Sequence, residues 1–314
     1  MHTFAIAADV GGTSVKLGLF GTDAQPISKW EIPTRTEDNG SHILPDIAAA
    51  IRNQTAQLGL DLHHAVGMGV GVPGPVDENG VVNSCVNLGW SKVDLTGELT
   101  RLLPEVPRFA AANDANAATL GELWQGGGKG YSNAVMLTLG TGVGGGVVIG
   151  SKILPGANGA AGEIGHMTVA PEETATCTCG KRGCLEQYAS AKGIVFLAKG
   201  MLTRCDTPSP LRNIPNFSAK DICDLAREGD PLSKQILDRC GRYLALAMSY
   251  LSCAVDPQVF LIGGGMSRAG EVLFDAIRPH YRSFAFHTGI HTPIVPARLG
   301  NDAGIYGCAA MALG

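Results

Sequence analysis

The residues best suited to chemistry lie between positions 166 and 184. His166 is followed by the segment CTCGKRGC, which holds Cys177, Cys179 and Cys184. One imidazole and three thiolates are a ligand set that a structural zinc ion binds tetrahedrally. The two glycines inside the segment let the chain fold back, so that the last cysteine reaches the same ion. This spacing predicts a zinc site, and a reduced cysteine cluster without metal is the alternative.

Two carboxylates flank this cluster. Glu163 precedes His166 by three residues, and Glu186 follows Cys184 by two. A metal ion that fixes the histidine also fixes whatever that loop contacts, and the second ring nitrogen of the histidine stays available for another partner. The alternative for Glu186 is a solvated carboxylate at the start of a helix, where the helix dipole favours it.

Three glycine-rich turns follow apolar runs that predict strands. They are DVGGT at 9–13, GTGVGGG at 140–146 and GGGMS at 263–267. Backbone N–H groups in such turns can hold phosphate oxygens. None matches the Walker A pattern or a convincing dinucleotide fingerprint, and each alone is typical of a tight turn. The three turns together, with Asp9 and Thr13 in the first, indicate a nucleotide-phosphate site.

A further carboxylate stands where a predicted strand meets a predicted helix. The apolar run 107–112 ends just before Asn113 and Asp114, and helical spacing covers 115–124. A position at the carboxyl end of a strand does not by itself make Asp114 catalytic. The alternative for Asp114 is an N-cap without a catalytic role.

The surrounding elements alternate between strands and helices, which indicates an α/β class. A strand, glycine turn and strand at 4–20 recurs at 134–149, which suggests an internal duplication with each copy opening a domain. We expect an N-terminal α/β domain at 1–113, with the helix 303–314 packing back on it, and a C-terminal α/β domain at 114–302 that carries the zinc loop. Further predicted elements are strands at 66–72 and 259–262 and helices at 41–58, 186–202, 219–227, 231–254 and 271–278.

Composition narrows the functional classes. The chain has 314 residues, of which 45% are hydrophobic and 17% charged, so a sizeable core is expected and wholesale disorder is not. The net charge is −4 and no Lys/Arg run exceeds two residues, which argues against nucleic acid as a partner. The nine cysteines favour a reducing compartment. No signal peptide is evident, and the longest apolar stretch is too short to span a bilayer. We therefore expect a cytoplasmic protein with no membrane partner.

With these motifs in place, the whole chain resembles the ROK sugar kinases of the actin, hexokinase and Hsp70 superfamily. DVGGTSVKLGLF resembles the first phosphate motif of that family, LTLGTGVGGGVV its second, and LIGGGMS its adenosine-side motif. GEIGH followed by CTCGKRGCLE resembles its signature loop, which is the most specific match. VNLGW and AANDANAATLGE are most similar to the bacterial glucokinases of the family.

The resemblance implies a two-domain actin/hexokinase/Hsp70-like (ribonuclease H-like) fold with an interdomain cleft. It implies that Asp114 is the general base toward the primary hydroxyl of the sugar, and that Asp9 lies near Mg²⁺. The implied sugar ligands are Gly74, Asn87, Asn113, Asp114, Glu163, His166 and Glu186. The implied nucleotide-side positions are Asp9, Gly11, Gly12, Thr13, Thr141, Gly142, Gly264 and Gly265. Asn87 as a simple turn residue is the alternative at that position.

The expected function is ATP-dependent phosphorylation of a hexose, glucose to glucose 6-phosphate, with ATP, catalytic Mg²⁺ and structural Zn²⁺. Alternatives are a kinase for N-acetylmannosamine, mannose or fructose, a sugar-binding protein without turnover, and a sugar-sensing regulator. Regulators of this family carry an N-terminal DNA-binding domain, and a first strand that starts near residue 3 leaves no space for one. The resemblance further implies a homodimer or homotetramer.

Overall fold

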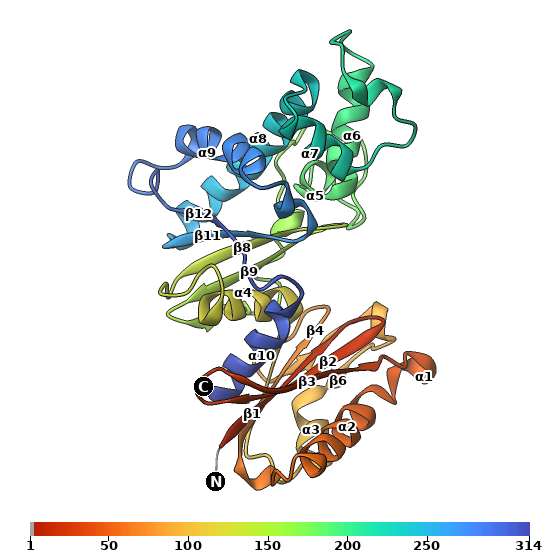
Figure 1. Ribbon diagram of the computed structural model, residues 1–314, viewed down its shortest axis with the longest axis vertical. Helices are drawn as coiled ribbons and strands as arrows, with labels where there is room; N and C mark the ends of the chain where they lie inside the picture. The colour runs from red at the N-terminus through yellow and green to blue at the C-terminus, as the bar shows by residue number, and fades with distance from the viewer. Residues whose placement is uncertain (1–2) are drawn as a thin grey trace. The chain divides into compact units, whose positions relative to one another are not determined.

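A computed structural model describes residues 3–314, and the predicted α/β class is confirmed by two five-stranded sheets with helices (Figure 1). The chain forms two compact units. The first unit holds residues up to 130 together with 146–162 and 298–314, and the second holds 131–145 and 163–297. The chain therefore crosses between the units at four points.

The first sheet is mixed. In spatial order its strands are β3 (Pro26–Pro33), β2 (Ser14–Gly21), β1 (Phe4–Val10), β4 (Ala65–Val72) and β7 (Phe109–Asn113). The strands β1 and β2 form the predicted antiparallel hairpin, whereas β1, β4 and β7 run parallel. Side chains alternate along β1, so that Phe4 and Ile6 enter one apolar cluster while Ala5 and Ala7 enter another. The sheet is therefore buried on both faces.

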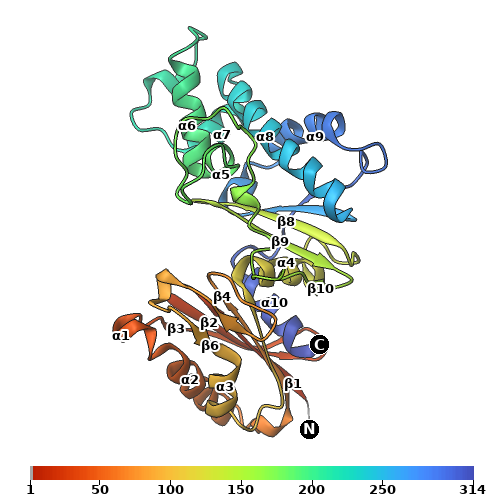
Figure 2. The ribbon, with the colours of Figure 1, turned by 180° about the vertical axis from the view of Figure 1, so that it is seen from behind.

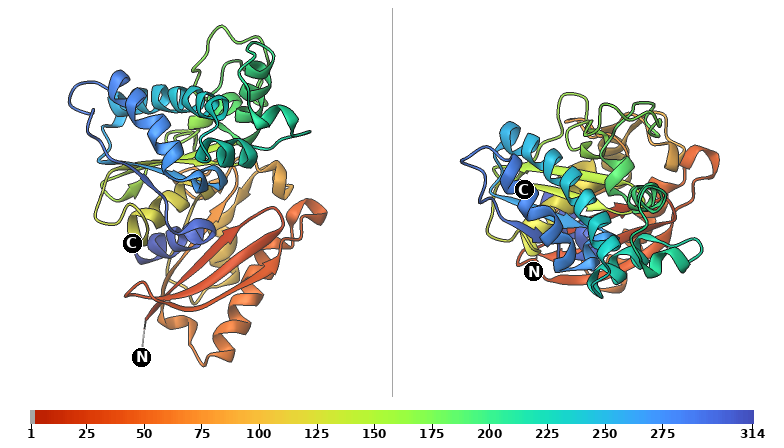
Figure 3. Two further views of the ribbon diagram at one scale, coloured as in Figure 1. Left: turned by 45° about the horizontal axis from the view of Figure 1, so that its top comes forward. Right: turned by 90° about the horizontal axis from the view of Figure 1, so that it is seen from above.

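Helices cover each face of this sheet. The helices α2 (Ile43–Gln57) and α3 (Leu95–Leu102) supply the first cluster, and α4 (Asp114–Gln125) and α10 (Ala303–Leu313) supply the second. Figure 1 shows α2 and α3 on the opposite side of the strands from α10, and Figure 3 shows α10 beside the strands of this unit. The unit also contains α1 (Glu37–Gly40) and a small ribbon of β5 (Val81–Val82) and β6 (Val93–Asp94).

The backbones of α4 and α10 approach each other closely. A Cβ atom at Gly121 would overlap the carbonyl oxygen of Ala303, and one at Gly307 would overlap that of Ala117. Only glycine at these two positions allows the helices to pack at this separation. This contact places residues 114–130 in the first unit, so the observed division does not follow the boundary predicted at residue 113.

The second sheet repeats the strand order of the first. Its strands in spatial order are β10 (Lys152–Ile153), β9 (Val143–Ile149), β8 (Ala134–Leu139), β11 (Val259–Gly263) and β12 (Ile294–Pro296). The strand β11 runs parallel to both β8 and β12. In both sheets the rank order along the chain is third, second, first, fourth, fifth, as expected from a duplicated unit.

The remaining helices, α5 to α9, belong to the second unit, and Figure 2 shows them labelled from behind. They are α5 (Glu186–Ala189), α6 (Ala191–Leu202), α7 (Ala219–Arg227), α8 (Pro231–Val255) and α9 (Glu271–Phe284). Short 3₁₀ turns complete the described chain: η1 (Leu62–His64), η2 (Val86–Leu88), η3 (Ile164–His166), η4 (Pro210–Asn213), η5 (Gly265–Ala269) and η6 (Gly300–Asp302). None of the helices within residues 3–314 combines the length and the apolar character that a bilayer crossing requires.

Two predicted helices differ from the observed ones. The helix predicted at 186–202 is interrupted at Ser190, which is extended (φ −80°, ψ 169°) and caps α6 by accepting a hydrogen bond from Gly193 N. A serine that caps a helix lies outside it, which ends α5 one turn earlier. The helix predicted at 271–278 continues through Pro279 to Phe284.

Candidate active site

Four of the predicted site residues meet at one edge of the first sheet. Asp9 is paired with Gly71 in the parallel register of β1 and β4, and Val72 is paired with Asn113 in that of β4 and β7. The carboxyl ends of these three strands therefore lie side by side, which is where open α/β sheets bind ligands. Asp9, the Gly74 turn, Asn113 and Asp114 all stand at this edge.

Asn113 and Asp114 have different roles at the start of α4: Asn113 caps the helix, and Asp114 presents an exposed carboxylate. Asn113 Oδ1 accepts hydrogen bonds from the backbone of Ala115 (2.9 Å) and Asn116 (3.3 Å), and its Nδ2 donates to Gly74 O at 3.2 Å. The N-cap of α4 is therefore Asn113. Asp114 follows in the first turn, where its exposed side chain accepts from Ala115 N at 2.8 Å. The N-cap interpretation thus applies to Asn113 rather than to Asp114.

Asp9 is a half-buried carboxylate next to glycines. A Cβ at Gly304 would overlap its Oδ2 atom, so only glycine leaves room for the carboxylate there. Burial, followed by repulsion from Asp114, raises the pKa of Asp9 to about 6, and Lys16 opposes this shift. Because the charge of Asp114 adds to the raised pKa of Asp9, a cation is favoured beside these carboxylates.

The turn after β1 is held from a neighbouring strand. Gly11 N donates to Ser14 O at 2.9 Å, which closes the turn and leaves Gly12 and Thr13 exposed. Thr34 Oγ1 donates to Gly11 O at 2.7 Å, and Thr34 N donates to Thr13 O at 3.0 Å. Thr34 was not singled out from the sequence, because nothing local marks the residue after β3 as a support for this turn.

Asn87 lies in the 3₁₀ turn η2, and the Asn87 side chain is exposed. Next to it Trp90 is buried, and its Nε1 donates to Gly40 O at 3.2 Å. Trp90 is thus a core residue that anchors the turn. Gly89 (φ 76°) and Gly40 (φ 67°) both need the left-handed region, where glycine is favoured.

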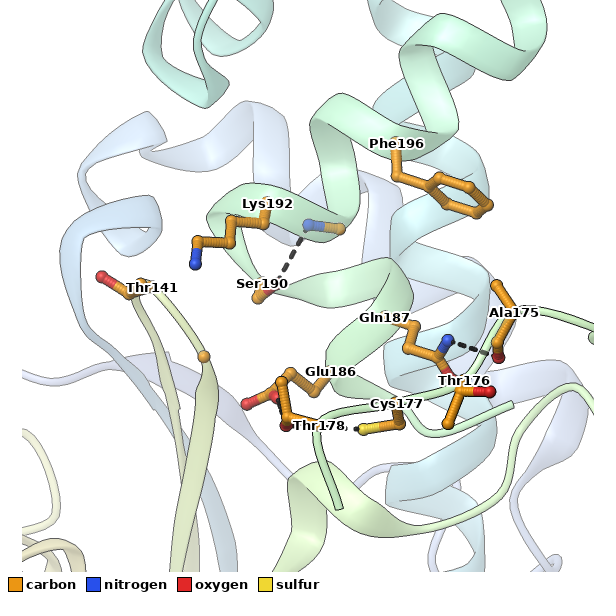
Figure 4. A pocket seen from close by; sticks show the side chains of 12 residues that line it. Thr141, Ala175, Thr176, Cys177, Thr178, Glu186, Gln187, Ser190, Lys192 and Phe196 are labelled. Carbon is orange, nitrogen blue, oxygen red and sulfur yellow. Dashed lines mark hydrogen bonds between the residues drawn. The ribbon is translucent and has the colours of Figure 1, made fainter. Parts of the chain in front are cut away.

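In the second unit, Glu186 is joined to the second glycine turn. Its Oε2 accepts from Val143 N at 3.1 Å, and its Oε1 accepts from Thr178 Oγ1 at 3.2 Å. Glu186 lines a pocket of about 430 Å³ together with Thr141 and Gly142. Figure 4 shows Thr178 beside Glu186, and Lys192 near Thr141. The solvated-carboxylate interpretation of Glu186 does not describe this arrangement, because both of its oxygens accept hydrogen bonds.

The His166 cluster has the dimensions of a tetrahedral metal site. Cys177 Sγ lies 3.8 Å from His166 Nδ1, and Cys179 Sγ lies 3.6 Å from Cys184 Sγ. All four candidate ligand atoms lie within 4.8 Å of one another. Sulfurs about 2.3 Å from a zinc ion are separated by about 3.8 Å in a tetrahedron, so the donor set fits this metal.

The other ring nitrogen of His166 faces a carboxylate. Its Nε2 lies 4.0 Å from Glu163 Oε2, while its Nδ1 faces the thiols. The two nitrogens therefore have different surroundings, and the shared role expected for His166, with a metal on one nitrogen and a second partner on the other, stays a prediction. Gly180 (φ 85°) and Gly183 (φ 69°) lie in the left-handed region and turn the chain back toward the cluster.

The third glycine turn also belongs to the second unit. Gly264 (φ 80°) follows β11 directly, and its backbone lies against that of Leu139 at the end of β8. Gly265 opens η5, and both glycines are exposed. The turn therefore offers backbone at the carboxyl ends of two neighbouring parallel strands.

The described residues thus assemble two separate groups. One, in the first unit, contains Asp9, Gly11, Gly12, Thr13, Gly74, Asn87, Asn113 and Asp114, and the other, in the second unit, contains Thr141, Gly142, Glu163, His166, Cys177, Cys179, Cys184, Glu186, Gly264 and Gly265. Thr178 and Thr34 were not predicted from the sequence. The signal for Thr178 was present, because a residue between two ligands of one ion is held near that ion.

Comparison with known proteins places this geometry in a family. Residues 5–314 match the ROK family. The chain is 38% identical to a glucokinase of Halalkalibacterium halodurans, with 96% of this chain and 92% of that protein covered. It is 31% identical to an N-acetylmannosamine kinase of Escherichia coli, with 98% of each covered.

Solved structures agree in fold. A ROK hexokinase from Thermus thermophilus superimposes with a TM-score of 0.80 at 30% identity, covering 98% of this chain and 97% of that one. A ROK family glucokinase from Streptomyces griseus, in complex with glucose and AMPPNP, gives a TM-score of 0.73 at 31% identity, covering 98% of each chain. The chain described here belongs to the ROK family.

Proposed function

We propose that this protein is an ATP-dependent hexose kinase that converts glucose to glucose 6-phosphate. The observation that carries the proposal is the pair of carboxylates, Asp9 and Asp114, at the carboxyl edge of the first sheet beside a glycine turn. In phosphoryl transfer the protein mainly positions the reactants and neutralises charge. The residues at this edge of the sheet can serve both functions. Membership of the ROK family and the likeness to glucokinases support glucose as the acceptor.

In this proposal Asp114 is the general base. It accepts the proton of the attacking primary hydroxyl while that oxygen forms its bond to the γ-phosphorus of ATP. The bond from this phosphorus to the β–γ bridging oxygen breaks in the same step, and ADP leaves. The hydrogen bond from Ala115 N holds the carboxylate in the first turn of α4. The side chain is exposed there and accessible to a ligand. Asn113, Gly74 and Asn87 bind sugar hydroxyls from the first unit, and Glu163, His166 and Glu186 bind them from the second.

The glycine turns bind the nucleotide. Gly11, Gly12 and Thr13 offer exposed or half-exposed backbone after β1, and Thr141 and Gly142 offer it after β8. Gly264 and Gly265 take the adenosine side. Asp9 fits an Mg²⁺ site, because its half-buried carboxylate lies beside a second carboxylate and a cation relieves both. When bound, Mg²⁺ neutralises charge on the phosphate oxygens.

Zinc has a structural role in this proposal. His166, Cys177, Cys179 and Cys184 fill all four positions of a tetrahedral ion, which leaves no open position for chemistry. Bound by these four residues, zinc would order the loop that bears Glu163, and Thr178, which donates to Glu186, would be held between two of its ligands.

N-acetylmannosamine is the competing acceptor, because kinases for this sugar are among the relatives. A site built for a free hydroxyl beside the anomeric carbon leaves little space for an acetamide, and discrimination through one added group can be as small as about tenfold. Values of kcat/KM for both sugars, within a panel that includes mannose and fructose, decide the substrate. A higher value for glucose supports the proposal, and a higher value for N-acetylmannosamine overturns the acceptor while leaving the kinase chemistry.

A further inference from the structure

Glu122 in α4 is a fully buried carboxylate that takes no part in the proposed chemistry. Its side chain is 0% exposed. Oε1 accepts hydrogen bonds from Leu299 N at 2.7 Å and Arg298 N at 3.0 Å. Oε2 accepts from Arg298 N at 2.9 Å and Gly127 N at 2.7 Å. A carboxylate satisfied only by backbone N–H groups holds two stretches of main chain together.

These two stretches are places where the chain changes unit. Gly127 lies three residues before Gly130, the last residue of the first unit before the chain crosses. Arg298 is the first residue of the first unit when the chain returns from the second. The side chain of Glu122 therefore holds both the segment where the chain first leaves the first unit and the segment where it enters that unit for the last time.

Two more residues on the same face of α4 contact a third crossing. Asn116, Thr119 and Glu122 are spaced three apart, which places them along one side of a helix, and all three are buried. Asn116 Oδ1 accepts from Val147 N at 3.3 Å, and Gly146 is so close to Thr119 that a Cβ would overlap its hydroxyl. Residue 146 is where the chain returns to the first unit for the first time.

The helix itself is firmly held in the first unit. Gly121 packs directly against the backbone of α10, and Asp114 lies at the start of the same helix. The crossing segments are thus attached to the element that carries the proposed general base. We propose that Glu122 is a hinge-positioning residue, whose hydrogen bonds to Gly127, Arg298 and Leu299 set how freely the crossing segments move.

The consequence for the enzyme rests on the proposed function. If the crossing segments move more freely, the protein spends more time in conformations that do not bind sugar. The apparent affinity for sugar then falls in proportion to the fraction of molecules that can still bind it. Saturating sugar selects the competent conformation, so kcat is retained. A loosened hinge therefore raises KM with little change in kcat, whereas simple loss of folded protein lowers the apparent kcat and leaves KM unchanged.

The test uses Glu122→Gln in the full-length protein. The amide replaces one acceptor oxygen by a donor. It therefore loses the bond from Gly127 N if the nitrogen takes the place of Oε2, or the bond from Leu299 N if it takes the place of Oε1, while Arg298 N keeps one acceptor in either case. The matched control is Asp230→Asn, another buried carboxylate, whose Oδ2 accepts from Ser233 N and Ser209 Oγ at the start of α8, away from every crossing. If Glu122→Gln does not fold, Glu122→Asp keeps the charge but shortens its reach.

Hydrogen exchange of the unliganded proteins gives a readout that needs no substrate. We expect exchange at 126–131 or 296–300 to become at least about tenfold faster in the Glu122 variant and to stay unchanged in the Asp230 control. We also expect the KM for glucose to rise about three- to tenfold with kcat within about twofold. Unchanged exchange in both segments, or an equal rise in KM for the Asp230 control, would overturn the inference. Failure of the wild-type protein to phosphorylate any hexose would refute the proposed function alone, since the exchange measurement still decides the role of Glu122.

Discussion

Thr178 donates a hydrogen bond to Glu186, with Thr178 Oγ1 3.2 Å from Glu186 Oε1. Thr178 stands between Cys177 and Cys179, two of the candidate zinc ligands. A residue flanked by two ligands of one ion has little freedom once the ion is bound. This single hydroxyl therefore connects the metal cluster to a carboxylate in the pocket beside the second glycine turn.

We expect Thr178→Ala to weaken sugar binding without affecting the chemical step. Loss of one hydrogen bond to an exposed or half-exposed carboxylate corresponds to about a three- to tenfold increase in the KM for the sugar. Thr178→Ser retains the hydroxyl and should behave as the wild type. Thr176→Ala removes a neighbouring exposed hydroxyl in the same pocket and is the matched control. Equal KM values for the alanine variants at both positions would show that the contact has no role.

Asp114→Asn should fold normally and lose most of its turnover. The amide is nearly isosteric, and Asn113 still caps α4. It cannot accept the proton of the attacking hydroxyl, so we expect kcat to fall by about 10²-fold or more. Steady-state kinetics together with a thermal melt measure both effects. A turnover within about threefold of the wild type would show that another group is the base.

The purified protein should contain about one zinc ion per chain, the stoichiometry of a single four-ligand site. Cys184→Ser should release the ion and lower both the melting temperature and the affinity for sugar, because Thr178 and His166 lose their anchor. Cys240→Ser alters a buried cysteine of α8 outside the cluster and is the control for general destabilisation. Elemental analysis that finds no zinc in fully active protein, prepared without chelators, contradicts the proposed site.

The stability of the unliganded protein should depend on Asp9 in a defined pH range. Because burial raises the pKa of Asp9 from 3.8 to about 6, the folded state holds this proton more tightly than the unfolded state does. Stability from this group is complete below about pH 4 and is lost as pH rises through 6. The cost above pH 6 is on the order of 3 kcal/mol.

Asp9→Asn should therefore raise the melting temperature at pH 8, while the difference between the two proteins shrinks toward pH 4.5. The same variant should lose activity, since the amide cannot replace a carboxylate beside Mg²⁺. Melting curves without ligand, at both pH values and in the same salt, provide the comparison. A variant that is less stable than the wild type at pH 8 contradicts the origin assigned to the raised pKa.

Elements with local signals were predicted from the sequence. The helix α7 starts at a capping box in which Ser218 and Asp221 bond reciprocally, and the hairpin β1–β2 has its glycine turn between two apolar runs. The strand β3 was missed, because it is an edge strand with an alternating, mostly exposed pattern. The short strand β12 has too few residues to show any period.

The site residues, too, could be predicted where their signal is local in the sequence. The cysteine cluster is local in sequence, so its spacing revealed it, and the order of strand and helix placed Asp114 at the edge of the sheet. Thr34 supports the first glycine turn across 23 residues, and Glu122 binds Arg298 across 176. Contacts of this kind depend on which strands and helices become neighbours, and no local pattern records that.

The most direct test of the central claim is phosphorus NMR of the purified protein with glucose, ATP and Mg²⁺. We predict that the γ-phosphate signal disappears while ADP and glucose 6-phosphate form in equal amounts, and that neither product forms when the sugar is left out. ATP that stays intact with glucose and with every other hexose of the panel would contradict the account, and so would ATP that releases free phosphate without forming a sugar phosphate.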